Sequence, residues 1–157
     1  MEKIRIHLQN AEKKILLADH LIYKIYPLVK EKTIILKTLS EINFSIFHSI
    51  NAILHYETLY KRLTISPSPE INLELFIKKC AKRYYLTDEE IVKIVQIISL
   101  NKKHSQSIME FRRGEKIVII SDQNHNLQTE VLDVEKIKSF LSTGRNLFEK
   151  AKKGIIS

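Results

Sequence analysis

KTLSEINFSIFHSINAILHYETLYKR, residues 37–62, is the stretch that decides the fold of this chain. Apolar residues recur through it and just before it in alternating steps of four and three, which is the spacing of one face of an α-helix. Two such stripes are present, and a helix that is apolar on more than one side must be surrounded by other helices. We therefore expect a central helix in a bundle. The stripes are Ile35, Leu39, Ile42, Ile46, Ser49, Ile53, Tyr56 and Tyr60, and Leu36, Phe47, Ile50 and Leu54.

The third face of this helix is polar and is the only place in the sequence where histidines line up. His48 and His55 are seven residues apart, so they lie on one side of the helix and about 10 Å apart along its axis. That separation is too large for a shared metal ion unless another helix supplies a ligand. The pair can act as general acid and base, or it can be a structural pair hydrogen-bonded between helices. Asp19 and His20 on the preceding segment can join it.

A first long helix is predicted over residues 2–26, because its apolar residues follow a heptad pattern. Pro27 has no backbone N–H, so this helix is expected to end or kink just before it. Residues 27–32 then form a short bend. Two helices joined by so short a connection fold back on each other as an antiparallel hairpin.

The second half of the chain combines shorter helices with β-structure. A loop rich in proline and serine precedes helices at about 70–81 and 87–103, and Thr87 and Glu90 have the spacing of a capping box. Residues 104–113 show no clean period and are expected to be irregular. Two β-rich runs within 115–132 flank an Asn- and Asp-rich connection and predict a β-hairpin. Asp133 is expected to cap a last helix that ends near residue 153.

These elements predict a mainly α fold, an antiparallel four- to five-helix bundle with one inserted β-hairpin at about 115–132. The length of 157 residues fits one domain over 1–157, and residues 105–157 can form a subdomain of it. An isolated two-stranded hairpin is marginally stable in water. We therefore expect the hairpin to pack on the helices or on a second copy.

Composition narrows the class of protein. The chain contains 44% hydrophobic and 28% charged residues, as ordinary globular proteins do. Three glycines leave no glycine-rich phosphate loop, and a single cysteine, Cys80, offers neither an internal disulfide nor a metal framework. The charged start predicts no signal peptide, and no apolar run is long enough to cross a membrane. We expect a cytoplasmic protein that binds no membrane, metal or cofactor.

The net charge of +8 favours a polyanionic partner such as RNA. The excess is spread along the chain, so the alternative is a set of solvated lysines that maintain solubility. Arg83, Tyr84 and Tyr85 join a cation to two rings that can stack on unpaired bases, although tyrosines also pack on cores. Arginine binds phosphate through two parallel hydrogen bonds, but Arg112 and Arg113 can instead pair with Glu110. The candidate nucleic-acid contacts are Arg83, Tyr84, Lys102, Lys103, Arg112 and Arg113.

Two long antiparallel helices, two shorter ones and a polar, histidine-bearing face on the second helix resemble the HEPN superfamily over about residues 1–105. The resemblance implies a homodimer that acts as an RNase, a toxin or a substrate-binding partner of a nucleotidyltransferase. RNase members carry an arginine and a later histidine on one helix, with four to six residues between them. No arginine in this chain has that neighbour, and the nearest arrangement is the reverse order, His55 then Arg62. The resemblance therefore implies a non-catalytic member.

Three hypotheses for the function follow. The first is a non-enzymatic helical bundle that binds RNA or another polyanion as a homodimer. The second is a protein–protein adaptor without a nucleic-acid role. The third is a divergent HEPN-like RNase that uses His48 or His55 with Arg62 as catalytic residues. We find no Ser/His/Asp or Cys/His nucleophile arrangement and no paired carboxylates, which favours the hypotheses without enzymatic activity.

Overall fold

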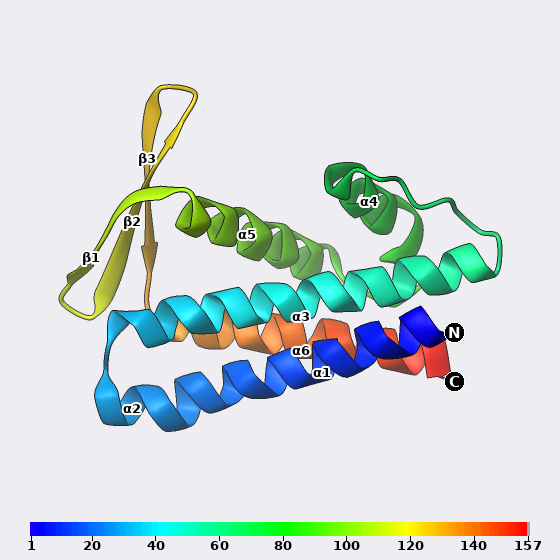
Figure 1. The fold of residues 1–157 in the computed structure, drawn as a ribbon, viewed down its shortest axis with the longest axis horizontal. Coiled ribbons are helices and arrows are strands. Elements are labelled where there is room, and N and C mark those ends of the chain that lie inside the picture. The colour runs from blue at the N-terminus through cyan, green and yellow to red at the C-terminus, as the bar shows by residue number, and fades with distance from the viewer. Residues whose placement is uncertain (157) are drawn as a thin grey trace.

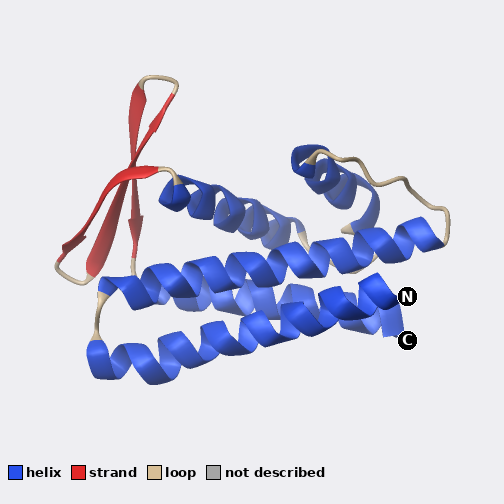
Figure 2. Cartoon of the chain, viewed as in Figure 1, coloured by secondary structure: helices blue, strands red, loops and turns tan. Residues whose placement is uncertain are grey.

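The computed structural model describes residues 1–156, which form a helical bundle with a small β-sheet at one end (Figures 1 and 2). The central helix α3 packs against α1 and α6 on one side and against α5 on the other. The predicted mainly α fold with an antiparallel hairpin is confirmed. The helical segments are α1 Glu2–His20, η1 Leu21–Ile25, α2 Tyr26–Val29, α3 Lys32–Leu59, α4 Pro69–Leu75, η2 Phe76–Cys80, α5 Asp88–Ser105 and α6 Val134–Ile156.

Helix α3 is the buried centre that its two apolar stripes predict. The first stripe is fully buried from Ile35 to Ile53. The polar third face meets α1, where Ser45 is buried and its Oγ donates a hydrogen bond of 2.8 Å to the Ala11 carbonyl, while His48 and His55 are half-buried. Two stripe residues are exposed instead. Phe47 lies beside an open groove, and Tyr60 follows the last helical residue.

Of the two outcomes expected at Pro27, an end or a kink of the first helix, the end is wrong, because helical structure continues to Val29. The segment before the proline is a π-helical turn, in which the Tyr26 N–H donates to the Leu21 carbonyl five residues back. A π turn widens the helix locally and changes the hydrogen-bond pairing, so the missing N–H of Pro27 is accommodated. The chain then turns at Lys30, whose φ of 51° is left-handed, and α3 runs back along α1.

Side-chain caps fix the starts of the later helices. Ser68 accepts a hydrogen bond from the Ile71 N–H at the start of α4. At the start of α5, Thr87 and Glu90 form the predicted capping box, with both of its hydrogen bonds present. Asp133 Oδ1 accepts from the Lys136 N–H at 2.8 Å, as predicted for the last helix. These caps satisfy amide groups that have no partner inside a helix.

The sheet has the antiparallel order β1-β2-β3, with β1 Ser107–Arg113, β2 Lys116–Gln123 and β3 Asn126–Leu132. The β2–β3 hairpin matches the prediction, and its two turn residues, Asn124 and His125, both have positive φ as a type I′ turn requires. The expectation of an irregular segment at 104–113 is wrong. The strand was missed because a bulge after Ser107 interrupts its alternation.

A continuous apolar cluster joins the helices to the sheet. It contains residues of α1, α3, α5 and α6, together with Ile117, Ile119 and Leu132 from the sheet. The two chain ends lie close together at the end of the bundle opposite the sheet (Figure 1). Within residues 1–156, none of the helices combines the length and apolar character that crossing a bilayer requires.

Candidate functional site

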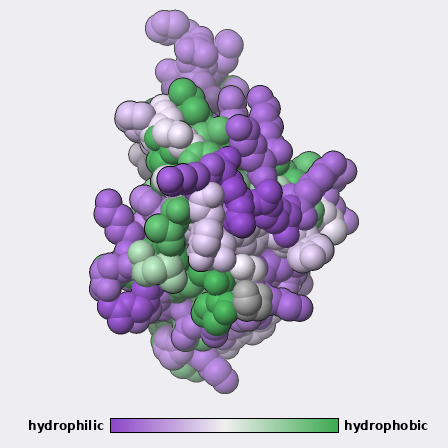
Figure 3. Space-filling view, turned by 90° about the vertical axis from the view of Figure 1, so that its right-hand side faces the viewer, coloured by the Kyte–Doolittle hydropathy of each residue, from purple (hydrophilic) through white to green (hydrophobic). Residues whose placement is uncertain are grey.

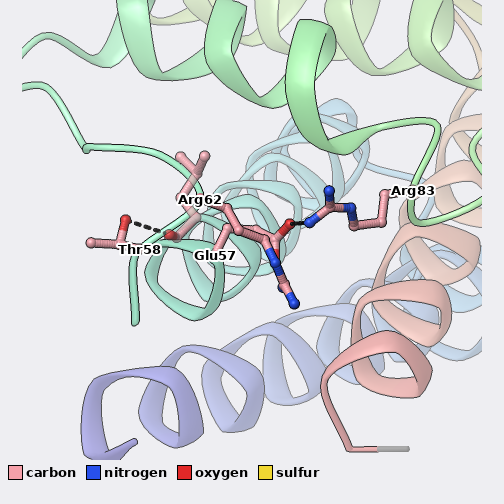
Figure 4. Close-up of polar contacts among 5 residues, drawn as sticks. Glu57, Thr58, Arg62 and Arg83 are labelled. Atoms are coloured by element: carbon pink, nitrogen blue, oxygen red, sulfur yellow. Dashed lines mark hydrogen bonds and ion pairs between the residues drawn. The ribbon is translucent and has the colours of Figure 1, made fainter. Parts of the chain in front are cut away.

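The most distinctive polar feature is a buried carboxylate held by two arginines. The Glu57 side chain, near the C-terminal end of α3, is 1% exposed. Its Oε2 accepts a hydrogen bond of 2.7 Å from Arg62, and its Oε1 accepts one of 2.5 Å from Arg83. Figure 4 shows the two guanidinium groups reaching Glu57 from different parts of the chain. Both arginine side chains remain about half exposed.

The end of α3 positions Arg62. The Arg62 N–H donates to the Glu57 carbonyl, and the Lys61 N–H donates to the Thr58 carbonyl, each at 2.9 Å. This pair of bonds is the Schellman motif, which requires a left-handed residue just after the helix. Lys61 is that residue, with φ of 58°. The motif therefore turns the chain back so that the Arg62 side chain reaches Glu57, one helical turn earlier.

A second Schellman motif positions Arg83. The Leu86 N–H donates to the Ala81 carbonyl and the Tyr85 N–H to the Lys82 carbonyl, each at 3.0 Å. Tyr85 takes the left-handed position, with φ of 62°, and is 84% exposed. A bulky residue at positive φ is strained, and such strain is concentrated at functional sites. The arginine just before this turn is thereby directed at Glu57.

The two tyrosines after Arg83 have opposite environments. Tyr84, named from the sequence as a stacking residue, is buried, so its ring faces the core rather than a base. Burial raises the pKa of its hydroxyl, and the nearby Glu57 carboxylate adds to the increase. The exposed ring is that of Tyr85. Of the pair, only Tyr85 can therefore offer a ring face to a partner in solution.

Cys80 lies in the same region and is a buried thiol. Burial raises its pKa to about 11, and the Glu57 carboxylate contributes in the same direction. A thiol with so high a pKa is protonated near neutral pH and is a poor nucleophile. Cys80 therefore packs in the core as a protonated thiol.

An open recess of about 590 Å³ adjoins Arg62. Lys61 and Lys79 add two positive charges to its lining, and Thr58 and Thr64 add hydroxyl groups. The end-on view in Figure 3 shows strongly hydrophilic residues grouped on this end of the molecule, with hydrophobic patches around them. Positive charge and hydroxyl groups around one recess form a surface suited to an anion.

The histidines of α3 form a separate cluster with a residue that the sequence did not indicate. His7 Nδ1 of α1 lies 2.9 Å from His48 Nδ1, and the His7 ring stacks on the His55 ring with centroids 5.4 Å apart. Asp19 does not join them, since it pairs with Arg145 instead. The antiparallel hairpin explains this, because Asp19 lies near the turn whereas His7 lies across from the C-terminal half of α3.

The histidine cluster is largely neutral at physiological pH. Burial lowers the pKa of His7 to about 4, and His48, His55 and Lys3 add to the decrease. Burial also lowers the pKa of His48 and His55, aided by Lys14 for the first and by Lys3 for the second. No hydrogen bond or ion pair within residues 1–156 joins these histidines to Arg62. The residues proposed for an RNase site therefore fall into two different clusters.

The other predicted basic contacts lie in the last turn of α5 and at the end of β1, and these elements meet at the sheet end of the molecule (Figure 1). Two of them bind the protein itself. Lys103 pairs with Glu130 at 2.7 Å, and Arg112 donates to the Tyr26 hydroxyl and to the Lys30 carbonyl. Glu110 pairs with His104 rather than with an arginine. Lys102 and Arg113 are exposed. The six predicted residues therefore do not form one continuous surface.

Sequence reasoning missed Glu57, although a signal was present. Glu57 follows Ile50 and Leu54 at steps of four and three, so a carboxylate occupies a position on an apolar stripe. A buried charge is stable only when paired, and Arg62 and Arg83 are the partners that the fold supplies.

Within residues 1–156, no three His, Cys, Asp or Glu side chains are arranged to hold a metal ion. Neither a protein-family model nor a curated protein matches the chain.

Proposed function

We propose that this protein binds RNA or another polyanion without catalysing a reaction on it, and that Arg62 and Arg83 contact the phosphates. The observation that carries the proposal is that two half-exposed arginines from separate elements are held on one buried carboxylate. An arginine has five N–H donors in a rigid fork. Each guanidinium donates through one nitrogen to Glu57, so donors remain for phosphate oxygens.

Preorganisation and charge both favour this use of the site. Because Glu57 already fixes the two side chains, less conformational entropy is lost when an anion binds. Glu57 contributes one negative charge, whereas Arg62, Arg83 and the recess lysines Lys61 and Lys79 contribute four positive ones. The net charge of the site is therefore +3. The exposed Tyr85 ring, two residues after Arg83, supplies a surface on which an unpaired base can stack.

A binding assay with matched variants tests the proposal. Fluorescence anisotropy of a labelled single-stranded RNA gives Kd for the wild type, for the double variant Arg62→Gln/Arg83→Gln and for Arg145→Gln. Arg145 is a suitable control because it is also a half-exposed arginine paired with a carboxylate, that of Asp19. We expect the double variant to weaken binding by at least about tenfold and the control to change it far less. Equal losses in the two variants would show that only overall charge matters.

Glu57→Gln separates an anion site from a purely structural ion pair. The substitution raises the net charge of the site from +3 to +4, and the glutamine amide oxygen can still accept from one of the two arginines. The added positive charge acts on every phosphate contact and outweighs the looser hold on the other arginine. The proposal predicts tighter RNA binding together with lower stability. A purely structural cluster predicts lower stability with unchanged or weaker binding. Thermal unfolding followed by circular dichroism supplies the stability readout on the same samples.

The alternative function, a protein–protein adaptor, is favoured by an apolar groove of about 330 Å³ between α3, α4 and α5. Phe47, Leu54, Leu73 and Ile98 line it together with three asparagines. Apolar grooves with a few polar groups bind peptides or small ligands. An adaptor's complex through this groove would be insensitive to salt, whereas a polyanion complex weakens steeply with salt.

We retain the HEPN-like layout in its non-catalytic form, because among the described residues no hydrogen bond or ion pair joins a histidine to Arg62. An RNase that used His55 would cleave RNA as the wild type and lose all cleavage in His55→Ala. The proposed binding protein is expected to cleave no RNA in either form. We place the protein in the cytoplasm, where RNA is present and where the free, buried thiol of Cys80 stays reduced.

A further inference from the structure

The two faces of the β-sheet differ in what they contact. Side chains of directly paired residues on neighbouring strands share a face of the sheet. The pairing register therefore places two rows on one side of the sheet: Arg112, Ile117 and Leu132, and Glu110, Ile119 and Glu130. Ile117, Ile119 and Leu132 are fully buried in the apolar cluster of the bundle. We call this side, which packs on the helices, the inner face.

The charged residues of the inner face are also bound to the helices. Lys103 of α5 pairs with Glu130, His104 with Glu110, and Arg112 with the Tyr26 hydroxyl. The sheet is therefore fixed to the bundle by both apolar packing and ion pairs. No further surface of the sheet is needed to hold it in place.

The opposite side, the outer face, is apolar and partly exposed. Its two central rows are Met109, Ile120 and Thr129, and Phe111, Val118 and Val131. Met109 is 57% exposed, Phe111 37% and Val131 40%, whereas Val118 between the last two is 7% exposed and Ile120 is half-buried. Strand β2 carries four apolar residues in succession, 117–120, a pattern typical of strands that are buried on both faces. Contiguous exposed apolar residues mark interaction surfaces.

The charges at the ends of the outer face indicate what covers it. Arg113 and Lys116 pair across the ladder at one end and point to the outer face, whereas Asp122 lies on the same face at the other end. The face is thus positive at one end, apolar in the middle and negative at the other end. When a second copy of the chain faces this surface with its strand direction reversed, the positive end of each copy meets the negative end of the other. A two-fold symmetric contact between identical copies can have this geometry.

We propose that a second copy of this chain packs on the outer face, with its strands running opposite to those of the first. A two-fold axis that lies between the two faces and crosses the strands places Lys116 of one copy near Asp122 of the other. An axis along the strands would bring the positive ends together, so the charges select the first arrangement. The self-association uses the end of the molecule away from Arg62 and Arg83 and does not depend on the proposed polyanion binding.

The size of the face sets the strength of the contact. Three strands about 4.8 Å apart and six residues at about 3.4 Å each cover roughly 300 Å² per copy. Two copies therefore bury roughly 600 Å² through the sheet, below the range of about 1,200–2,000 Å² of stable complexes. The dimer is thus weak and forms in proportion to concentration rather than being permanent.

Sedimentation velocity of the full chain without RNA, from micromolar to hundreds of micromolar, measures the association. The wild type is expected to shift from monomer to dimer with rising concentration. Phe111→Thr/Val131→Thr removes apolar area but keeps β-forming residues, and is expected to weaken dimerisation at least about tenfold. Val92→Thr/Val95→Thr removes exposed valines from α5 and is the matched control, with no effect expected. Circular dichroism confirms that the variants are folded.

A charge exchange tests the orientation. Asp122→Lys and Lys116→Asp alone each place like charges together and are expected to weaken the dimer, whereas the combination Lys116→Asp/Asp122→Lys restores opposite charges and regains affinity. A wild type that stays monomeric at all concentrations would overturn the proposal. So would a dimer that the sheet variants leave unchanged, or single charge variants that the combination does not rescue.

Discussion

The arrangement around Glu57 predicts that Arg62 and Arg83 are energetically coupled. Replacing either arginine by glutamine leaves the Glu57 carboxylate with one charged partner, so each single variant loses little stability. Replacing both leaves a carboxylate that is 1% exposed without a partner. Breaking a buried charge pair in this way costs about 3–5 kcal/mol. The double variant is therefore expected to lose clearly more unfolding free energy than the two single variants lose together.

Urea unfolding followed by far-UV circular dichroism measures the four free energies of unfolding that the cycle needs. For a chain of this length, the double variant should melt roughly 10 °C below the wild type. The same cycle in a Glu57→Gln background is the control, because without the carboxylate the arginines have nothing to neutralise and their coupling should vanish. Additive single losses, or an equal coupling with Gln at position 57, would refute the reasoning.

Three further predictions concern single positions. His7 has a pKa of about 4 in the folded protein, against an ordinary value of 6.5. As pH falls, the unfolded chain therefore binds the proton first, and the free energy of unfolding should decrease between pH 6.5 and pH 4. His7→Gln should reduce this pH dependence, and an unchanged pH profile in the variant would contradict the prediction. Gly154→Ala places a Cβ 2.5 Å from the buried Tyr84 ring, so we expect a loss of about 1–3 kcal/mol in urea unfolding; a gain would mean that the ring moves freely. Thr87→Ala removes the capping box of α5 and should cost about 1 kcal/mol in the same assay, with no change expected if the cap were redundant.

The helical part of the fold was predictable because its signals are local. The stripes of α3 report directly which residues are buried, and a threonine three residues before a glutamate reports a helix start. Pro27 misled the prediction, because its usual effect is local but the π turn that accommodates it is set by the packing of the whole helix. Strand β1 was missed because only its partner β2 makes it a strand, and the bulge hides its period.

The candidate site was predictable only in part, because ion pairs between distant segments leave little trace in a single sequence. Arg62 and Arg83 were each singled out, for different reasons, but the sequence did not show that they meet. Glu57 connects them, and its place on an apolar stripe was the available signal. His7 could have been inferred from the antiparallel hairpin once its turn was fixed near Lys30, since that register places the start of α1 opposite the C-terminal half of α3.

The dependence of RNA affinity on salt tests the central claim most directly. Plots of log binding constant against log salt concentration have a slope of about −0.7 for each phosphate that a protein contacts on a single strand. If Arg62 and Arg83 each contact a phosphate, Arg62→Gln/Arg83→Gln should have a slope shallower than that of the wild type by about 1.4, while Arg145→Gln keeps the wild-type slope. Parallel lines for the double variant and the wild type would contradict the account.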